Sequence, residues 1–241
     1  MQNHPAQEAP IREVLLEAMK TGRFSKNDHL PRESMLAEML GISRTQLRDT
    51  LAMLEREGFI TRRHGVGTII NHHVLNVPNR MDIEVEFLDM IRKSGFAPAV
   101  AFIHPAEDKA DEKVAARLRL PVGTPILRMA RLCTADGRPA VYCEDVVELS
   151  RVKDIRPAGD RAIPFFRFLK DCCDIVPYMD LTDLHPAAAD RKLAEVFHVA
   201  EGTPLLNMDE VDFDIDGQPV FCSDEYFIDG IIRLTAMRKK F

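Results

Sequence analysis

The segment Ser43-Arg44-Thr45-Gln46 brings side-chain hydrogen-bond donors to the first turn of a predicted helix. Its serine and glutamine are the two halves of a capping box, in which each side chain satisfies one free backbone amide at the helix start. Apolar residues then recur at spacings of four and three, and they are Leu47, Leu51 and Leu54. The opposite face, with Arg44, Thr45 and Arg48, is therefore expected to stay in water. Guanidinium and hydroxyl groups on that face could contact the phosphates and base edges of DNA.

A shorter apolar helical pattern precedes this helix and is separated from it by a tight turn. It ends in Leu36, Met39 and Leu40, and Gly41 follows where a helix needs a residue that tolerates a left-handed cap. Gly58 ends the second helix. Two short helices joined in this way are typical of a helix-turn-helix unit, whose second helix lies in the major groove of DNA.

A predicted hairpin follows the second helix. Residues 59–63 and 68–70 are expected to be its strands and His64-Gly65-Val66-Gly67 its turn, because glycine adopts backbone angles that other residues avoid. Such a wing would bring Arg62, Arg63 and His64 near phosphates and its small tip into the minor groove. The alternative is that the exposed arginines are only solvated, and that Gln46 is wholly occupied as a cap.

From Ile11 to Asn71 the sequence resembles the GntR family of bacterial winged-helix regulators. The resemblance lies in Leu30-Pro31, in the Ser-Arg-Thr helix start and in the Gly-x-Gly-Thr wing. Serine and arginine stand in the opposite order in Arg32-Glu33-Ser34, so the family's phosphate-binding arginine falls on Ser34, and whether Arg32 replaces it is open. The residues that the resemblance implies for DNA binding are Arg32, Ser34, Arg44, Thr45, Gln46, Arg48, Arg62, His64 and Gly65.

The formal net charge of −6 would repel DNA rather than attract it. The first 75 residues hold ten basic and nine acidic side chains, so the acidic excess lies in the rest of the chain. Because the DNA-binding part is only weakly basic, binding is expected to need a dimer with two recognition helices and to weaken with salt. No segment is apolar enough to cross a membrane, and the N-terminus is unlike a secretory signal, so a cytoplasmic protein is expected.

Five cysteines, an odd number without CxxC spacing, favour neither a disulfide framework nor a zinc site. They are Cys133, Cys143, Cys172, Cys173 and Cys222. We expect them to be reduced and to pack as small apolar side chains. No cofactor and no bound metal are predicted.

A repeated pattern marks the second part of the chain. Gly123-Thr124-Pro125 returns as Gly202-Thr203-Pro204, and Asp136-Gly137 returns as Asp216-Gly217, at offsets of 79 and 80 residues. Each copy predicts a helix, a strand, an Asp-Gly hairpin turn and a second strand. Two copies are expected to form one antiparallel sheet with a pseudo-twofold axis and with helices on one face.

The predicted fold class is α+β, with a winged helix-turn-helix joined to an antiparallel sheet domain. The expected domain boundaries are residues 1–72 for DNA binding, 73–82 for a linker and 83–241 for the sheet domain. Between the two copies of the repeat, a helix over residues 165–175 and a strand over 178–184 are expected to complete the sheet domain.

From Ile83 to Arg238 the chain is similar to the UTRA effector domain of the HutC branch of GntR regulators. The similarity rests on the order of these elements and on Gly95 after a short helix. It implies a chorismate-lyase-like α+β fold in which a small effector lies between the sheet and its covering segments, with Arg131 on an anionic group. The effector-binding residues that it implies are Glu86, Phe87, Arg131, Cys133, Tyr142, Glu144, Asp224 and Tyr226.

Two departures from the family pattern argue against a phosphosugar as the effector. Cys133 stands where the family's sugar-phosphate sensors tend to have a second arginine, and Glu86-Phe87-Leu88 stands where they tend to have Ser-Phe-Thr. Groups that would hold a phosphate are therefore missing, and a smaller carboxylate or an amine-bearing ligand is expected. The alternative is that Arg131 and Glu144 pair with each other across a hairpin.

Together these resemblances imply a homodimeric repressor, not an enzyme, that binds an inverted-repeat operator and responds to a small-molecule effector. The effector is expected to favour a domain arrangement that cannot match both half-sites. A ligand-independent DNA-binding factor and a lyase-like enzyme are the alternatives, although no catalytic constellation has a defining spacing. An all-helical metal-binding effector domain is disfavoured, because only His104, His185 and His198 lie beyond the linker, among strand patterns.

Overall fold

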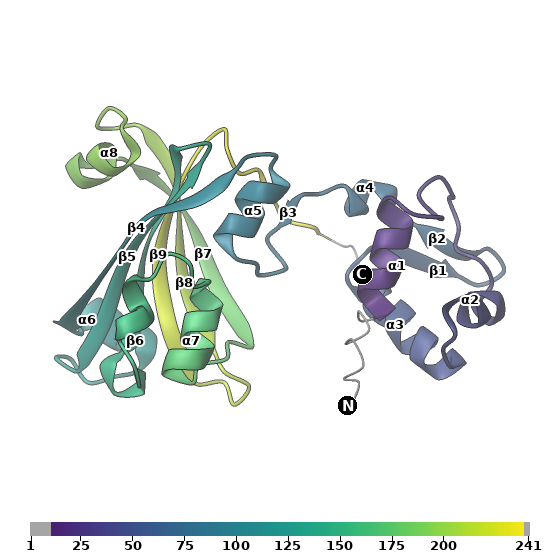
Figure 1. The fold of residues 1–241 in the computed structure, drawn as a ribbon, viewed down its shortest axis with the longest axis horizontal. Helices are drawn as coiled ribbons and strands as arrows, with labels where there is room; N and C mark the ends of the chain where they lie inside the picture. The colour runs from purple at the N-terminus through teal and green to yellow at the C-terminus, as the bar shows by residue number, and fades with distance from the viewer. Residues whose placement is uncertain (1–10, 239–241) are drawn as a thin grey trace, which may run out of the picture. The chain divides into compact units, whose positions relative to one another are not determined.

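The computed structural model describes residues 11–238, and the chain divides into two compact units between Val77 and Pro78 (Figure 1). In the part of the chain that the structure describes, no helix is both long enough and apolar enough to span a lipid bilayer. Each unit buries its own apolar side chains, and the two are described in turn.

Over residues 11–77, the first unit consists of three helices, a two-stranded hairpin and one short final helix. Its elements are α1 (Ile11–Lys20), α2 (Glu33–Leu40), α3 (Arg44–Arg56), β1 (Ile60–Arg63), β2 (Gly67–Ile70) and α4 (His72–Leu75). Leu15 of α1, Leu36 of α2 and Leu54 of α3 are at most 1 % exposed. The apolar stripe predicted for α3 therefore packs into the core of this unit and leaves the opposite face of the helix in solvent.

The turn and the wing form where the sequence predicts them. Ser43 Oγ accepts a hydrogen bond from the Gln46 amide over 3.2 Å, and Gln46 Oε1 accepts one from the Ser43 amide over 3.1 Å, which confirms the capping box. Gly41, with φ of 65°, closes α2 in the left-handed conformation. In the hairpin, β1 and β2 pair antiparallel with Arg63 opposite Gly67.

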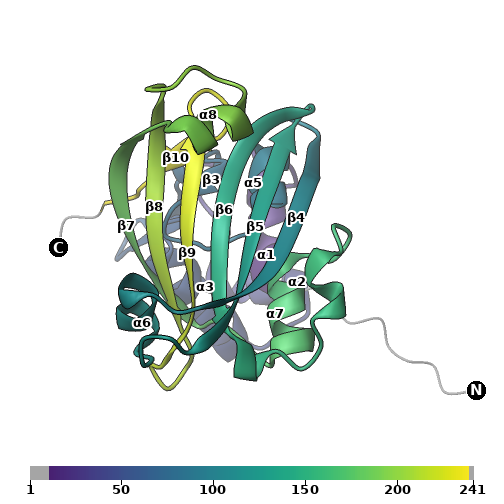
Figure 2. The same cartoon turned by 90° about the vertical axis from the view of Figure 1, so that its left-hand side faces the viewer.

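A six-stranded antiparallel sheet is the centre of the second unit, in the order β4-β5-β6-β9-β8-β7 (Figure 2). Its strands are β4 (Pro98–Lys109), β5 (Pro125–Ala135), β6 (Arg138–Glu148), β7 (Met179–Ala188), β8 (Pro204–Phe213) and β9 (Pro219–Ile228). The helices of this unit are α5 (Phe87–Lys93), α6 (Glu112–Leu118), α7 (Phe165–Cys173) and α8 (Arg191–Phe197). The predicted α+β class is confirmed.

The two copies of the repeat form the two halves of this sheet. One copy supplies α6, β5 and β6, the other supplies α8, β8 and β9, and the halves meet where β6 pairs with β9. Asp111 and Asp190 cap the two helices in the same way, because each carboxylate accepts a hydrogen bond over 2.8 Å from the amide three residues on. The expected sheet of two similar halves is therefore present.

Helices cover both faces of the sheet. The two helices of the repeat lie on one face, where α6 packs on Ile126 and Val146 and α8 on Leu132. On the other face, α7 packs on Leu127 and Phe221, and α5 packs beside it on the same side. The central strands β5 and β6 are thus buried on both faces, although the repeat alone predicts helices on one face.

Part of the segment expected to be a linker has regular structure. The helix α4 ends at Leu75, which is buried in the first unit. In the second unit, β3 (Asn79–Arg80) pairs in parallel with β10 (Leu234–Thr235), and the Asn79 side chain donates to Ser94 Oγ over 2.9 Å. Only residues 76–78 connect α4, the last element of the first unit, to β3, the first element of the second.

Candidate functional site

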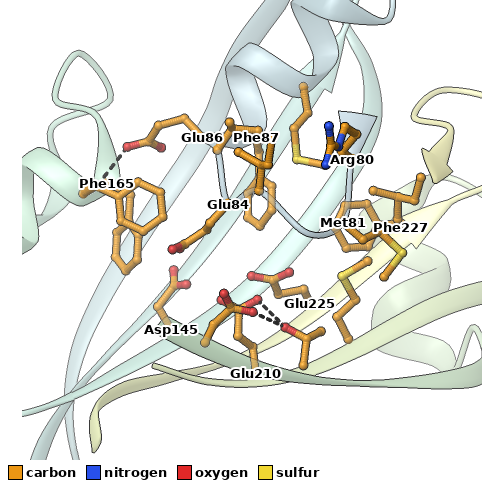
Figure 3. Close-up of a pocket in the computed structure, with 18 of the residues that line it drawn as sticks. Arg80, Met81, Glu84, Glu86, Phe87, Asp145, Phe165, Glu210, Glu225 and Phe227 are labelled. Carbon is orange, nitrogen blue, oxygen red and sulfur yellow. Dashed lines mark hydrogen bonds between the residues drawn. The ribbon is translucent and has the colours of Figure 1, made fainter. Parts of the chain in front are cut away.

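A cavity of about 690 Å³, its mouth included, opens on the face of the sheet that α5 and α7 cover (Figure 3). Side chains from β5 to β9 form its floor, and the segment from Arg80 to Phe87 covers it. Phe87, Phe165 and Phe227 contribute apolar walls. A concave site with apolar walls and polar groups is typical of a small-molecule site.

Carboxylates from four neighbouring strands line the floor of this cavity. They are Asp145 on β6, Glu225 on β9, Glu210 on β8 and Asp180 on β7. The strand register explains why these carboxylates lie close together. Asp145 on one neighbouring strand and Glu210 on the other are both paired with Ser223 of β9, so their side chains point to the same face of the sheet. Glu84 and Glu86 add two more carboxylates from the covering segment.

Arg131 on β5 is buried against Asp145 in this floor. Its Nη2 donates to Asp145 Oδ1 over 3.0 Å, its Nε donates to Oδ2, and Ser223 Oγ donates to the same Oδ1 over 3.0 Å. Burial opposes the charge of the guanidinium, but the Asp145 carboxylate outweighs this effect and raises the pKa of Arg131. An anionic ligand group at Arg131 would therefore compete with a carboxylate that is already in place.

The two halves of the sheet differ in charge at equivalent positions. The 79-residue offset that relates β5 to β8 makes Glu210 the counterpart of Arg131, and the 80-residue offset makes Glu225 the counterpart of Asp145. Burial, with Glu210 and Asp145 nearby, raises the pKa of Glu225 well above its ordinary value. Burial and the neighbouring Asp180 raise the pKa of Glu210 to about 7. One half of the floor thus holds an ion pair, and the other half holds crowded acids.

Glu84 lies at the mouth of the cavity, above the floor. Burial and the charges of Glu210, Asp180 and Glu86 raise its pKa to about 8. Both basic side chains that line the cavity have acidic partners, since Arg80 forms an ion pair with Asp82 and Arg131 forms one with Asp145. The crowded acids therefore lack a positive partner, and a cationic ligand group would stabilise their ionised forms.

Four residues expected to line the effector site lie on the opposite face of the sheet. They are Tyr142, Glu144, Asp224 and Tyr226, which contact the helices of the repeat. Glu144 forms an ion pair with Lys192 of α8, and Asp224 accepts a hydrogen bond from Lys113 of α6 over 2.8 Å. The structure thus contradicts their expected place in the cavity.

The physical reason for this correction is the two-residue period of a strand. Neighbouring residues point to opposite faces, so Asp145 and Glu225 reach the cavity while Glu144 and Asp224 face α8 and α6. The alternative pairing of Arg131 with Glu144 is wrong for the same reason, because Arg131 pairs with Asp145.

The other expected effector residues lie in or beside the cavity. Glu86, Phe87 and Arg131 line it, and Glu86 Oε1 also accepts a hydrogen bond from the Phe166 amide over 2.9 Å. Cys133 lines a smaller neighbouring cavity of about 460 Å³, and burial raises its pKa to about 11. All five cysteines are free and buried, which agrees with the expected structural role.

Five acids of the cavity are absent from the sequence-based set, and they are Glu84, Asp145, Asp180, Glu210 and Glu225. The repeat itself contained a signal for one of them, because Glu210 stands at the position equivalent to Arg131. Glu84 and Asp180 lie outside the repeat, where the sequence holds no comparable pattern.

The exposed face of α3 is the first part of a candidate DNA-binding surface. Arg44 and Thr45 project into solvent from its first turn. Arg48 is also exposed, and its Nε donates to Glu33 over 2.8 Å. The Gln46 side chain is held in the capping box, which agrees with the alternative view of this residue as a cap.

A groove beside the wing is the second part of this surface. Its basic side chains are those of His29, Arg32, Arg62, Arg63 and His64, and Gly65 lies at the wing tip. Arg62 Nε donates to Glu55 over 2.7 Å, so a phosphate would compete with that carboxylate. Ser34 and Arg32 are both exposed at the start of α2, and either could reach a phosphate.

Models of known families match both units of the chain. Residues 93–229 match the UTRA domain, and residues 8–70 match the bacterial regulatory proteins of the gntR family. The chain is 23% identical over 243 residues to "Probable fructoselysine utilization operon transcriptional repressor" of Escherichia coli, and the match covers 99% of this chain and 97% of that protein.

Two proteins of Bacillus subtilis are also similar. The "Uncharacterized HTH-type transcriptional regulator YurK" is 22% identical over 214 residues, which are 88% of this chain and 87% of that protein. The crystal structure of the "possible transcriptional regulator YydK" has the same fold, with a TM-score of 0.77 at 16% identity over 95% of this chain and 97% of that chain.

Proposed function

Because this chain belongs to the gntR family of bacterial regulatory proteins with a UTRA domain, and is therefore an effector-modulated DNA-binding regulator, we propose that its effector is a small amine. We further propose that the protein is a homodimeric repressor, that it acts in the cytoplasm, and that its operator is an inverted repeat. The effector bound in the second unit lowers operator affinity because it prefers one of two domain arrangements.

The observation that carries the amine proposal is the charge of the cavity. Six carboxyl groups line it against two guanidinium groups, and both guanidinium groups are already paired with aspartates. The pKa values of Glu84, Glu210 and Glu225 are raised, so these acids ionise more readily when a cation lies beside them. A protonated amine gains from this arrangement, whereas a carboxylate ligand would be repelled by it. The aromatic rings of Phe87, Phe165 and Phe227 can hold the apolar part of the ligand and add cation–π attraction.

The edge strand β7 supports the homodimer. It pairs with β8 on one side alone in this sheet order, so its other edge is available to a second copy. Met179 and Leu181 on this strand and Tyr178 just before it are 51 %, 64 % and 67 % exposed. Exposed apolar side chains beside an open sheet edge are typical of an interface.

The first unit supports the assignment of operator contacts. Arg44 and Thr45 project from the first turn of α3, the part of a recognition helix that reaches base edges. A dimer would present two such helices to half-sites about 34–36 Å apart, which corresponds to an inverted repeat. His64 and Gly65 of the wing, with Arg32 or Ser34, would contact the flanking backbone.

The test uses an operator selected from random duplexes and a matched pair of ligands. Amines that raise the melting temperature of the full chain are added to the protein–operator complex, and each is compared with its N-acetylated form, which has no charge. We expect the amine, and not its acetylated form, to release the operator in a fluorescence anisotropy titration. Equal effects of the two forms would refute the amine assignment, and no effect of any small molecule would favour a ligand-independent factor.

A matched pair of variants localises the effect. Glu225→Gln removes a carboxyl group that a bound amine would ionise, and Glu144→Gln makes the same change on the opposite face of the sheet. We expect the first variant to weaken the response to the amine at least about tenfold, the loss of about 1.4 kcal/mol, and the second to leave it unchanged.

A further inference from the structure

Asp212 on β8 is fully buried beside the cavity. Its side chain is 0 % exposed, and neither carboxylate oxygen accepts a hydrogen bond from any residue that the structure describes. Asp145 is equally buried, but Arg131 and Ser223 donate to it. A buried carboxylate without a donor is costly, so Asp212 requires either a proton or a cation.

Two further carboxylates converge on Asp212. Glu210 lies two residues earlier on the same face of β8, and Glu84 points down from the covering segment toward the floor of the cavity (Figure 3). Each of the three side chains contributes one carboxylate oxygen, and these three oxygens lie within 4.8 Å of one another. The basic side chains of the cavity do not form ion pairs with these three carboxylates. Arg80 pairs with Asp82, and Arg131 pairs with Asp145.

The spacing and the tightness of the group fit a metal ion. Oxygen ligands lie about 2.0–2.6 Å from Mg²⁺ or Ca²⁺, so ligands on opposite sides of the ion are about 4–5 Å apart. Each Asp212 oxygen has less than 1 Å² of exposed surface, so bulk water does not solvate its charge. A bare ion is small enough to lie between these oxygens.

We propose that Glu84, Glu210 and Asp212 form a binding site for one divalent cation that prefers oxygen ligands, the class of Mg²⁺, Ca²⁺ and Mn²⁺. Glu84 would close the site from the covering segment, while the other two ligands come from the sheet. Thr182 Oγ1, 3.0 Å from Glu210 Oε2, would orient the Glu210 carboxylate.

The cation site and the amine effector are compatible. A bound divalent ion neutralises most of the charge of its three ligands, whereas Glu86, Asp180 and Glu225 still line the cavity. The cation proposal does not depend on the identity of the effector or on DNA binding, because it is tested by direct metal binding. Failure of one proposal therefore leaves the other open to its own test.

The experiment titrates the full chain, stripped with a chelator, with Mn²⁺ near neutral pH and follows the free ion by electron paramagnetic resonance. We expect each chain to bind one Mn²⁺, which removes the signal of that ion. Excess Mg²⁺ or Ca²⁺ should displace the bound Mn²⁺ and restore the signal. Asp212→Asn and Glu84→Gln should each weaken Mn²⁺ binding at least about tenfold. Asp183→Asn is the matched control, since Asp183 is exposed on β7 and points away from Asp180 and Thr182, and it should bind as the wild type does.

Two results would overturn the cation site. One is that no Mn²⁺ binds up to about 1 mM, the weak end of carboxylate sites, which would mean that protons alone satisfy Asp212. The other is that both ligand variants bind Mn²⁺ as tightly as the wild type, which would place the ion elsewhere. Glu84→Gln guards against misfolding as the cause of a loss, because Glu84 lies outside every helix and strand. The thermal unfolding of this variant without metal should match that of the wild type.

Discussion

Replacement of Asp145 by asparagine tests the electrostatic core of the second unit. The substitution keeps the shape of the side chain but removes the charge that faces Arg131, which is 8 % exposed and makes two hydrogen bonds to Asp145. Loss of one partner leaves a guanidinium buried without its counterion, and such losses cost about 3–5 kcal/mol. For a domain of this size, this corresponds to a fall in Tm of about 6–20 °C.

The assay is differential scanning calorimetry of the full chain, in which the transition of the second unit is followed. Asp108→Asn is the control, because Asp108 is exposed and its ion pair with Arg128 over 3.3 Å lies in solvent, so no measurable shift is expected. The double variant Arg131→Met with Asp145→Asn removes the orphaned charge and should recover most of the lost stability.

Two outcomes would refute this reasoning. If Asp145→Asn unfolds within about 1 °C of the wild type, the pair contributes far less than a buried ion pair should. If the double variant is less stable than Asp145→Asn, the loss comes from packing or from Ser223 rather than from the unpaired guanidinium.

Four further predictions follow from the same structure. Arg44→Ala should weaken operator binding by about 1–3 kcal/mol in an anisotropy titration and relax preference at one position of each half-site, whereas equal losses on all duplexes would make it a phosphate contact. Ser43→Ala should destabilise the first unit by about 1 kcal/mol in chemical denaturation, because α3 loses its cap. Leu181→Asp should shift the protein toward monomer in sedimentation velocity, and an unchanged dimer would exclude the β7 edge from the interface. Burial opposes the ionisation of Glu144, but hydrogen bonds from Lys192 and Tyr142 hold its pKa below the usual 4.5. The stability that Glu144 contributes is therefore lost as pH falls through that lowered pKa. Glu144→Gln should flatten the fall of Tm between about pH 6 and pH 3.

The first unit could be predicted in detail because its signals are local. A capping box, a left-handed glycine and a glycine-containing turn each act within a few residues, so Ser43, Gly41 and Gly65 place their elements without help from distant contacts. The repeat extended this to the second unit, since Gly123 and Gly202 mark equivalent turns before equivalent strands. The covered second face of the sheet was not predicted, because α7 lies outside the repeat.

The cavity could be predicted only in part, for a reason that lies in the central strands. A strand with one face in water alternates apolar and polar residues, and this alternation identifies the inward side chains. The strand β6 is buried on both faces, so Glu144 and Asp145 look alike in the sequence and the wrong one of the pair was expected inside. Glu84 and Asp180 join the cavity through long-range pairing of β3 and β7, which no local pattern encodes.

The exchange of Arg131 for Glu210 between the two halves of the sheet gives the cavity a direction. A half-domain that had been duplicated and fused would at first enclose a site with identical ends, suited to a symmetrical molecule or to one that binds in either orientation. Divergence at this pair of positions breaks that equivalence, so the proposed amine would have one preferred orientation. The orientation of the bound molecule, and with it any effect on operator binding, would then depend on this one difference between the two halves.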